Sequence, residues 1–377
     1  MANLIRIKQD KAIKLNQKIL NYLNPDFVYI PIEKGFELKI KTNDQINKEG
    51  ILLQKNNQYI YSPISGKVIG ACNIQVGNKK TKGIVVENDF CEKTPKISGI
   101  KRYINNYSKE EALSLIKEFN AYHGNFKGNS MVINGIDAEP YVLTNSYIIG
   151  KYTNEILETI DALSTIFELH RSYFAIKNND TENVHQLVHH IGTYPNINLK
   201  LMADLYPIGD KKILINSLIS SRKQQGGVIY LTVSEIYAIY NVLKRKRPIT
   251  EVIITVTGDM LDEAKVLNVK VGTSLKDILE NNFKIKAGEY KIVINGLMGG
   301  YEINTLDFVI NPNITAIFIT SLPKTFKKKC INCGMCHTKC PYGCDPRSNY
   351  RMENCTDCGI CSYVCPANVN FRKKGDK

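Results

Sequence analysis

Eight of the eleven cysteines lie in two runs near the C-terminal end of the sequence, and they constrain the fold more than any other feature. The runs read Cys330-x2-Cys333-x2-Cys336-x3-Cys340-Pro341 and Cys355-x2-Cys358-x2-Cys361-x3-Cys365-Pro366. This spacing is typical of chains that hold two [4Fe–4S] clusters: each tight loop places three thiolates around one cluster, and its fourth cysteine binds the other cluster. The pattern therefore predicts that the first cluster is bound by Cys330, Cys333, Cys336 and Cys365, and the second by Cys355, Cys358, Cys361 and Cys340.

Other uses of these cysteines explain the pattern less well. Zinc sites pair two Cys-x2-Cys units across a longer loop, and they need neither a third cysteine at the same interval nor a Cys-Pro step. Disulfide frameworks belong mainly to small secreted chains. Cys344 fits neither run, so we expect it to be a buried thiol rather than a ligand.

The composition is that of an ordinary globular protein with several domains. The 377 residues are 43% hydrophobic and 23% charged, which leaves ample material for a core. No apolar run approaches the length that crosses a bilayer, and the first residues lack the apolar stretch of a signal peptide. We therefore expect a cytoplasmic location, where thiols stay reduced.

The formal net charge of +14 is strongly basic. Eight thiolates and two oxidised cluster cores would lower it by about 4 charges. A basic balance favours acidic partners such as a small electron carrier, a nucleotide phosphate or an anionic membrane face, and no nucleic-acid recognition signature is present. Basic residues flank the cysteine runs, as a solvated rim or as a ring that steers an acidic redox partner: Lys324, Lys327, Lys328, Lys329, Arg372, Lys373, Lys374 and Lys377.

The order of strand-like and helix-like segments predicts a multidomain α+β protein. Residues 1–25 are expected to form an N-terminal arm, either a short helix or an irregular segment. Four further segments are expected: a β-rich barrel-sandwich hybrid (26–97), an α/β domain (98–247), a β-grasp module of the SLBB-like kind (248–322), and a ferredoxin-like domain with two clusters (323–377).

Helical and strand periods alternate in the segment 98–247, which favours a mainly parallel sheet. Helices are expected at 109–119, 154–169, 181–191 and 233–244, and strands at 131–134, 173–177 and 197–202. Sheets of this kind bind ligands at the carboxyl ends of their strands. The loop 134–140, directly after the first strand, is therefore a candidate site.

The sequential order of these pieces resembles the RnfC-like family, which comprises the cluster-bearing C subunit of the Rnf electron-transport complex and its soluble relatives, among them the electron-donating partners of cobalamin and proline reductases. The similarity runs from Phe27 through nearly the whole chain. The matching elements are 29–32, 62–68, 133–141, 206–212, 255–258, 271–273 and both cysteine runs. The resemblance implies a domain like the flavin-binding subunit of respiratory complex I, between the barrel-sandwich and β-grasp modules.

In that family the loop corresponding to 134–140 lies at a flavin and nicotinamide pocket. The resemblance therefore implies that Asn134, Gly135, Asp137 and Glu139 line a pocket for FMN or NADH, although a capping turn before a helix is an equal interpretation of the acidic pair. The family's glycine-rich loop with its Phe-Pro step corresponds here to 121–130, which has two separated glycines and no Phe-Pro. This departure weakens the expectation of FMN, because closely spaced glycines let amides approach a phosphate.

Taken together, the sequence predicts an iron–sulfur electron-transfer subunit. It would relay electrons from a flavin or NAD(P)H source through two [4Fe–4S] clusters to a partner reductase or an Rnf-type complex. Two alternatives stay open: an FMN-dependent NADH dehydrogenase in its own right, and an iron–sulfur sensor or scaffold. The resemblance also implies protein redox partners and, at most, a peripheral position on the cytoplasmic face of the inner membrane.

Overall fold

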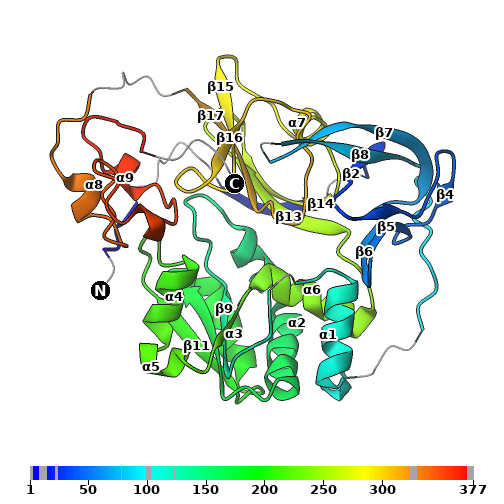
Figure 1. The fold of residues 1–377 in the computed structure, drawn as a ribbon, viewed down its shortest axis with the longest axis horizontal. Coiled ribbons are helices and arrows are strands. Elements are labelled where there is room, and N and C mark those ends of the chain that lie inside the picture. Colours follow the sequence, from blue (N-terminus) through cyan, green and yellow to red (C-terminus); the bar gives the residue numbers. More distant parts are fainter. Residues whose placement is uncertain are drawn as a thin grey trace.

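The computed structural model describes residues 3–7, 15–21, 24–77, 79–98, 103–122, 124–322 and 329–371, with the backbone alone for 15–21. Figure 1 shows an α/β domain in green beneath two β-rich parts in blue and yellow, with the cysteine-rich segment in orange and red at one side. The protein is thus a mixed α/β molecule with several parts, as expected.

The α/β domain is built on a four-stranded sheet in the order β11-β10-β9-β12, in which every pairing is parallel. Its strands are β9 (Ser130–Asn134), β10 (Arg171–Lys177), β11 (Ile197–Met202) and β12 (Val228–Thr232). Its helices are η1 (Ile104–Asn106), α1 (Lys109–Glu118), α2 (Thr144–Ile166), α3 (Thr181–Ile191), α4 (Lys211–Leu218), α5 (Ser221–Gln224) and α6 (Val233–Arg245). The parallel sheet predicted from the alternating pattern is confirmed.

Local sequence signals explain why α1 and α6 begin where they do. Ser108 with Glu111, and Thr232 with Glu235, each form a reciprocal capping box at the first turn. Apolar side chains of these helices and of α2 pack on the sheet in one large core. The sheet is therefore covered, and its strands, such as the fully buried β9, are largely apolar.

Helix α2 begins at Thr144, ten residues before the predicted start at 154. Its first part contains Gly150 and several β-branched residues, which are weak helix formers, and Tyr152 leaves helical geometry with φ −126° and ψ 31°. The carboxylate of Asp137, from outside the helix, accepts hydrogen bonds from the backbone N–H groups of Asn145 and Ser146. The contact with Asp137 thus stabilises a helix start at Thr144 that the helix propensities of the first residues do not predict.

The segment 248–322 contributes five strands of a six-stranded sheet in the order β1-β14-β13-β17-β15-β16. They are β13 (Glu251–Thr257), β14 (Ala264–Lys270), β15 (Tyr290–Ile294), β16 (Tyr301–Ile303) and β17 (Ala316–Ser321), accompanied by α7 (Leu275–Asn282). The sixth strand is β1 (Leu15–Asn21), which pairs parallel with β14. The helical interpretation of the N-terminal arm is therefore wrong for these residues, since a partner strand far along the chain decides their conformation.

The segment 26–97 forms a four-stranded sheet, β2-β8-β7-β4, and a three-stranded sheet, β3-β5-β6. The strands are β2 (Phe27–Pro31), β3 (Glu37–Leu38), β4 (Gln45–Ile46), β5 (Ile51–Lys55), β6 (Gln58–Tyr61), β7 (Gly66–Val76) and β8 (Lys79–Asn88). Apolar residues of both sheets share one core. Four charged side chains, Lys48, Glu92, Glu251 and Lys270, connect this part to the six-stranded sheet.

The C-terminal segment holds α8 (Met335–Thr338), η2 (Met352–Asn354) and α9 (Ile360–Tyr363). Most of the basic residues that flank the cysteine runs in the sequence, namely 324, 327, 328, 372, 373, 374 and 377, lie outside the described residues. Within the described part of the chain, no helix combines the length and the apolar character needed to cross a membrane.

Candidate metal centre

The two cysteine runs fold in the same way, 25 positions apart. Each has a one-turn helix, α8 or α9, that begins after a glycine in the left-handed region, Gly334 with φ 77° and Gly359 with φ 76°. Two residues before each glycine, Asn332 and Asp357 also have positive φ, at 57° and 59°. The backbone therefore makes the same tight loop twice, as the repeated spacing predicts.

Backbone N–H groups are directed at cysteine sulfurs in both loops. Asn332 donates to Cys330 Sγ and Asp357 donates to Cys355 Sγ, both at 3.4 Å. The fourth cysteines repeat the pattern: Cys340 Sγ accepts from the N–H of Cys344 at 3.3 Å, and Cys365 Sγ accepts from that of Val369 at 3.4 Å. Hydrogen bonds of this kind favour a thiolate, the form that binds iron.

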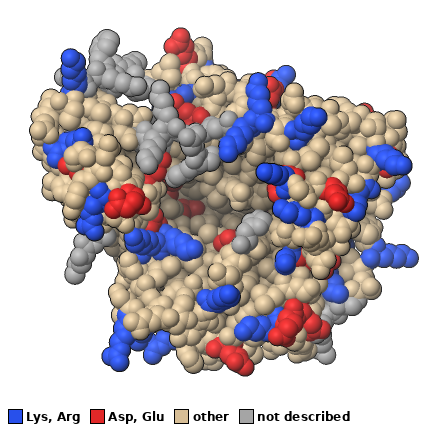
Figure 2. Space-filling view, in the orientation of Figure 1, with Lys and Arg blue, Asp and Glu red and all other residues tan. Residues whose placement is uncertain are grey.

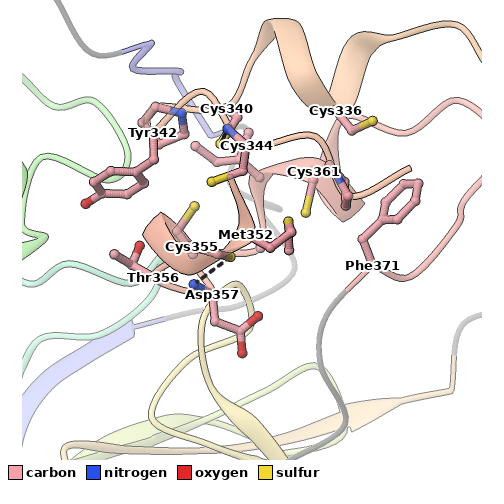
Figure 3. Close-up of a pocket in the computed structure, with 15 residues that line it drawn as sticks. Cys336, Cys340, Tyr342, Cys344, Met352, Cys355, Thr356, Asp357, Cys361 and Phe371 are labelled. Carbon is pink, nitrogen blue, oxygen red and sulfur yellow. Dashed lines mark hydrogen bonds between the residues drawn. The ribbon is translucent and has the colours of Figure 1, made fainter. Parts of the chain in front are cut away.

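The four cysteines predicted for the second cluster line one cavity of about 30 Å³, which Figure 3 shows. Its lining includes Cys340 from the first run together with Cys355, Cys358 and Cys361 from the second. Cys336 and Cys344 also border it. Cys340 of the first run thus lies with three cysteines of the second run, and the assignment of these four to one cluster stays a prediction.

The cysteines predicted for the first cluster differ widely in exposure. Cys330 and Cys333 are exposed, Cys365 is half-buried, and Cys336 is buried. Arg347 stands beside this loop, because its guanidinium donates to Asn332 Oδ1 at 2.6 Å and to both carboxylate oxygens of Asp345. Among the described residues, no group of three or more His, Cys, Asp or Glu side chains is arranged to hold a single metal ion.

Burial raises the pKa of the Cys358 thiol to about 12, with further increases from neighbouring cysteines. Burial likewise raises the pKa values of Cys336 and Cys361. Without a cation these thiols stay protonated at neutral pH, so loading with iron must release protons. Burial also raises the pKa of Cys344 to about 12, and its thiol donates to the carbonyl of Arg351 at 3.2 Å.

The second cysteine loop is attached to the α/β domain through Tyr206. The Tyr206 hydroxyl lies 2.7 Å from the carbonyl oxygen of Cys358 and 3.0 Å from Glu139 Oε1. Nearby, the hydroxyl of Tyr342 donates to Asp210, which also caps α4. In the sequence, the motif 206–212 is one of the elements that match the RnfC-like family. Its contacts with the cysteine loops join residues too distant in sequence for any local signal to reveal.

Asn134 and Gly135, two residues of the predicted flavin pocket, contact other residues of the α/β domain. The amide of Asn134 donates to the carbonyl of Gly209 at 3.0 Å and to the hydroxyl of Tyr230 at 2.9 Å, and its oxygen accepts from the N–H of Ile136. Gly135 is packed so closely that an added Cβ would lie 2.7 Å from the ring of Phe174. Both residues lie at the carboxyl end of β9, where the loop was expected, but they serve packing.

The carboxylates of Asp137 and Glu139, in the same loop, also accept hydrogen bonds from the protein itself. Asp137 caps α2, as the alternative interpretation predicted, and burial raises its pKa to about 6. Glu139 accepts hydrogen bonds from the backbone N–H groups of Met298 and Gly299, both at 2.9 Å, in the loop between β15 and β16. All four predicted pocket residues thus have contacts within the protein, and their place in a flavin pocket stays a prediction.

A larger cavity, of about 530 Å³, is lined by none of these four residues. It is bordered by Tyr122, Asn145, Tyr152 and Tyr237 of the α/β domain and by residues 312–315 of the six-stranded-sheet part. The rings of Tyr152 and Tyr237 stack with their centroids 4.0 Å apart. A volume of this size accommodates a nucleotide-sized ligand.

Comparison with known proteins agrees with the resemblance found in the sequence. Residues 117–243 match the Nuo51 FMN-binding domain family. The C subunit of the ion-translocating oxidoreductase complex of Buchnera aphidicola is 23% identical over 355 residues, covering 86% of this chain and 75% of that protein. The C subunit of the proton-translocating ferredoxin:NAD(+) oxidoreductase complex of Clostridium ljungdahlii is 24% identical over 356 residues, covering 85% and 77%.

Among solved structures, an NAD+-reducing [NiFe]-hydrogenase in its H2-reduced state superposes with a TM-score of 0.50 at 10% identity. The match covers 67% of this chain and 54% of that chain, so this chain spans about half of the neighbour's length, and the likeness concerns the fold alone. Over most of its length the chain is thus a relative of the C subunits of ion-translocating oxidoreductase complexes, and it contains a domain of the Nuo51 FMN-binding type.

Proposed function

We propose that this chain is an electron-transfer subunit that relays electrons from a flavin or NAD(P)H source through two [4Fe–4S] clusters to a partner reductase or an Rnf-type complex. The observation that supports it most directly is the shared cavity of Cys340, Cys355, Cys358 and Cys361. The bound clusters would supply one-electron transfer. Cys330, Cys333, Cys336 and Cys365 would hold the first cluster, and Cys340, Cys355, Cys358 and Cys361 the second.

The chain's own residues fit this role. The two loops place sulfurs by a repeated backbone, and amide N–H groups at 3.3–3.4 Å stabilise their negative charge. Cys340, Cys358 and Cys361 are half-buried, which limits the access of water to the second site. Hydrogen bonds to sulfur and limited solvent exposure are the features by which proteins set cluster potentials.

The domain interpretation follows the same proposal. We assign residues 26–97 to a barrel-sandwich hybrid, 248–322 to a β-grasp module and 323–377 to a ferredoxin-like domain. The relatives are subunits of larger complexes by name. We therefore propose protein redox partners for this chain and a peripheral position beside a membrane-bound complex.

Anaerobic reconstitution tests the proposal. The protein is expected to bind about eight iron and about eight sulfide per chain, and reduction should give the paramagnetic signal of two interacting [4Fe–4S] clusters. Stoichiometric zinc, or far fewer irons without a signal on reduction, would refute it.

A second candidate is an NADH dehydrogenase with its own FMN. It is favoured by the 530 Å³ cavity, whose lining comes from both ends of the segment that matches the FMN-binding domain family, Tyr122 near one end and Tyr237 near the other. Acid extraction of the anaerobically purified protein separates the candidates. About one flavin per chain would support the second, whereas absence of flavin together with reducible clusters would support the relay alone.

A further inference from the structure

The two cysteine loops have the same backbone but are covered differently. Ile360, which follows Gly359 in the second loop, has 0% of its surface exposed. Its counterpart 25 positions earlier, Met335, is 39% exposed, and the neighbouring Ile331 is 63% exposed. The described residues therefore offer an internal comparison in which the second loop is covered more closely than the first. The contacts of the first loop with distant parts of the chain include Asn3, which donates to the carbonyls of Thr338 and Cys340.

The cover on the second loop comes from the chain's own domains. Gly359 lies so close to the loop between β15 and β16 that an added Cβ would be 2.1 Å from the carbonyl oxygen of Met298. Ile360 packs in one apolar cluster with Tyr206 and Met298. At Gly334, the equivalent position of the first loop, the nearest atom to an added Cβ is 3.8 Å away, on the side chain of Arg347.

The first loop therefore leaves an apolar surface and a shallow metal site open to solvent. Tyr350, 57% exposed, extends this surface, since its ring lies 6.3 Å from that of His337 in the same loop. We call the residues Ile331, Met335 and Tyr350 the open face. Large apolar side chains grouped in this way mark interaction sites more often than chance exposure does.

The surroundings of the open face are basic. Lys329, Lys339 and Arg351 are exposed beside it. In the sequence, residues 323–377 contain eleven Lys and Arg against four Asp and Glu. Lys and Arg side chains are visible on this lobe at the left of Figure 2. Positive charge around an apolar centre complements a carrier with an acidic surface and speeds its association.

We propose that the open face is the docking surface for a small acidic one-electron carrier protein, which exchanges electrons with the first cluster. The inference rests on the proposed relay and assigns its two ends: the covered second loop faces the α/β domain, and the first loop faces the carrier. In each encounter the reduced cluster loses one electron and the carrier's oxidised cofactor gains it, with no bond formed or broken.

Stopped-flow mixing of the dithionite-reduced, reconstituted protein with oxidised flavodoxin, an acidic carrier, tests the inference. The substitutions Met335→Glu and Tyr350→Glu place negative charge on the open face, and Val188→Glu does so at a distant, 59% exposed site on α3. At low salt the second-order rate constant should fall at least tenfold for the two face variants and stay unchanged for Val188→Glu. Added salt should slow the wild-type reaction.

Iron content and the paramagnetic signal of each variant distinguish failure of the docking face from failure of the proposed electron relay. Variants that keep both clusters but reduce flavodoxin at the wild-type rate would overturn the docking face and leave the relay intact. Equal slowing by Val188→Glu would overturn it as well. A wild-type protein without reducible clusters would refute the relay, and the docking face with it. Lys339→Glu provides an independent variant, expected to weaken both the rate and its salt dependence.

Discussion

At the scale of single residues, the nine cysteines of the C-terminal segment divide into ligand candidates and one bystander. Cys344 borders the same cavity as Cys358 and has a similarly raised pKa, but its thiol already donates to a backbone carbonyl. Proximity alone therefore does not identify a ligand. The predicted ligands are instead chosen from the repeated spacing, and backbone amides point at the sulfurs of Cys330, Cys340, Cys355 and Cys365.

The substitutions Cys358→Ser and Cys344→Ser should separate these roles. Loss of Cys358 removes one of four thiolates, so bound iron should fall from about eight to about four per chain. Serine at 344 can still donate its hydroxyl to the Arg351 carbonyl, so that variant should keep its full iron content. Iron analysis after anaerobic reconstitution measures both, and an iron deficit in Cys344→Ser would show that this thiol is a ligand.

Asp137 is expected to make stability depend on pH. Burial raises its folded-state pKa from 3.8 to about 6, whereas the unfolded chain keeps the ordinary value. The folded state therefore binds the proton more tightly, and stability is lost as pH rises through this interval, by up to about 3 kcal/mol. Between pH 7 and pH 5 the wild type should gain stability on acidification.

The matched variant is Asp137→Asn, which cannot ionise. Thermal unfolding of both proteins between pH 5 and pH 7 should show that the gain on acidification is smaller in the variant. Parallel pH profiles for the two proteins would contradict the assignment. Comparing the proteins at each pH removes the contribution of all other titrating groups.

At the scale of elements, the matching helices α8 and α9 allow a measurement of how much the contact between Gly359 and Met298 stabilises the second cysteine loop. Gly334→Ala and Gly359→Ala both place a side chain at a φ near 77°, which costs about 1–2 kcal/mol. Only the second also collides with the Met298 carbonyl. We expect Gly359→Ala to lower the midpoint of thermal cluster loss clearly more than Gly334→Ala. Equal losses would mean that the contact with Met298 contributes nothing.

Much of the α/β domain could be predicted from the sequence, because its helices and strands carry strong local patterns. The strands at β9, β10 and β11 and the helices α1, α3 and α6 are confirmed. Strand β12 is not predicted because it runs without a turn into α6, and β1 because its partner β14 is distant in sequence. The start of α2 depends on Asp137, a contact outside the helix.

The two sets of cysteine ligands could be proposed from the spacing alone. The residues that surround the cysteine loops could not be predicted from the sequence. Nothing local indicates that Tyr206 reaches Cys358 or that Tyr342 reaches Asp210, since these contacts join residues more than a hundred positions apart. For the same reason, nothing local indicates that Glu139, a predicted pocket residue, accepts a hydrogen bond from the loop at Met298. Long-range contacts fix which loop of the pair is covered.

At the scale of the whole molecule, a group of four charges joins two parts of the chain. Lys270, with 9% of its side chain exposed, lies 2.6 Å from Glu251 and 3.3 Å from Glu92. Although burial alone would raise it, the pKa of Glu251 lies below its usual value because Lys270 donates a hydrogen bond to it. The carboxylates are therefore charged at neutral pH, and each depends on its cationic neighbour.

Lys270→Met should destabilise the protein by about 3 kcal/mol, because it removes the nearest cation of Glu251 and leaves Lys48 as the one cation shared by Glu251 and Glu92. The control is Lys276→Met, which breaks an exposed pair with Glu280 at 3.9 Å and should cost less than about 0.5 kcal/mol. Thermal unfolding midpoints compare the two. Similar midpoints would show that the four-charge group does not connect the parts energetically.

The strand β1 has a consequence for how the polypeptide reaches its native state. Its register pairs Leu15 with Ala264, and residue Ile5 pairs with Tyr206 through two backbone hydrogen bonds. The partners of Ile5 and Leu15 are therefore synthesised much later than these residues themselves. Pairing with them closes very long loops, and such closures are slow steps. We infer that the segments around Ile5 and Leu15 are among the last to reach their native positions.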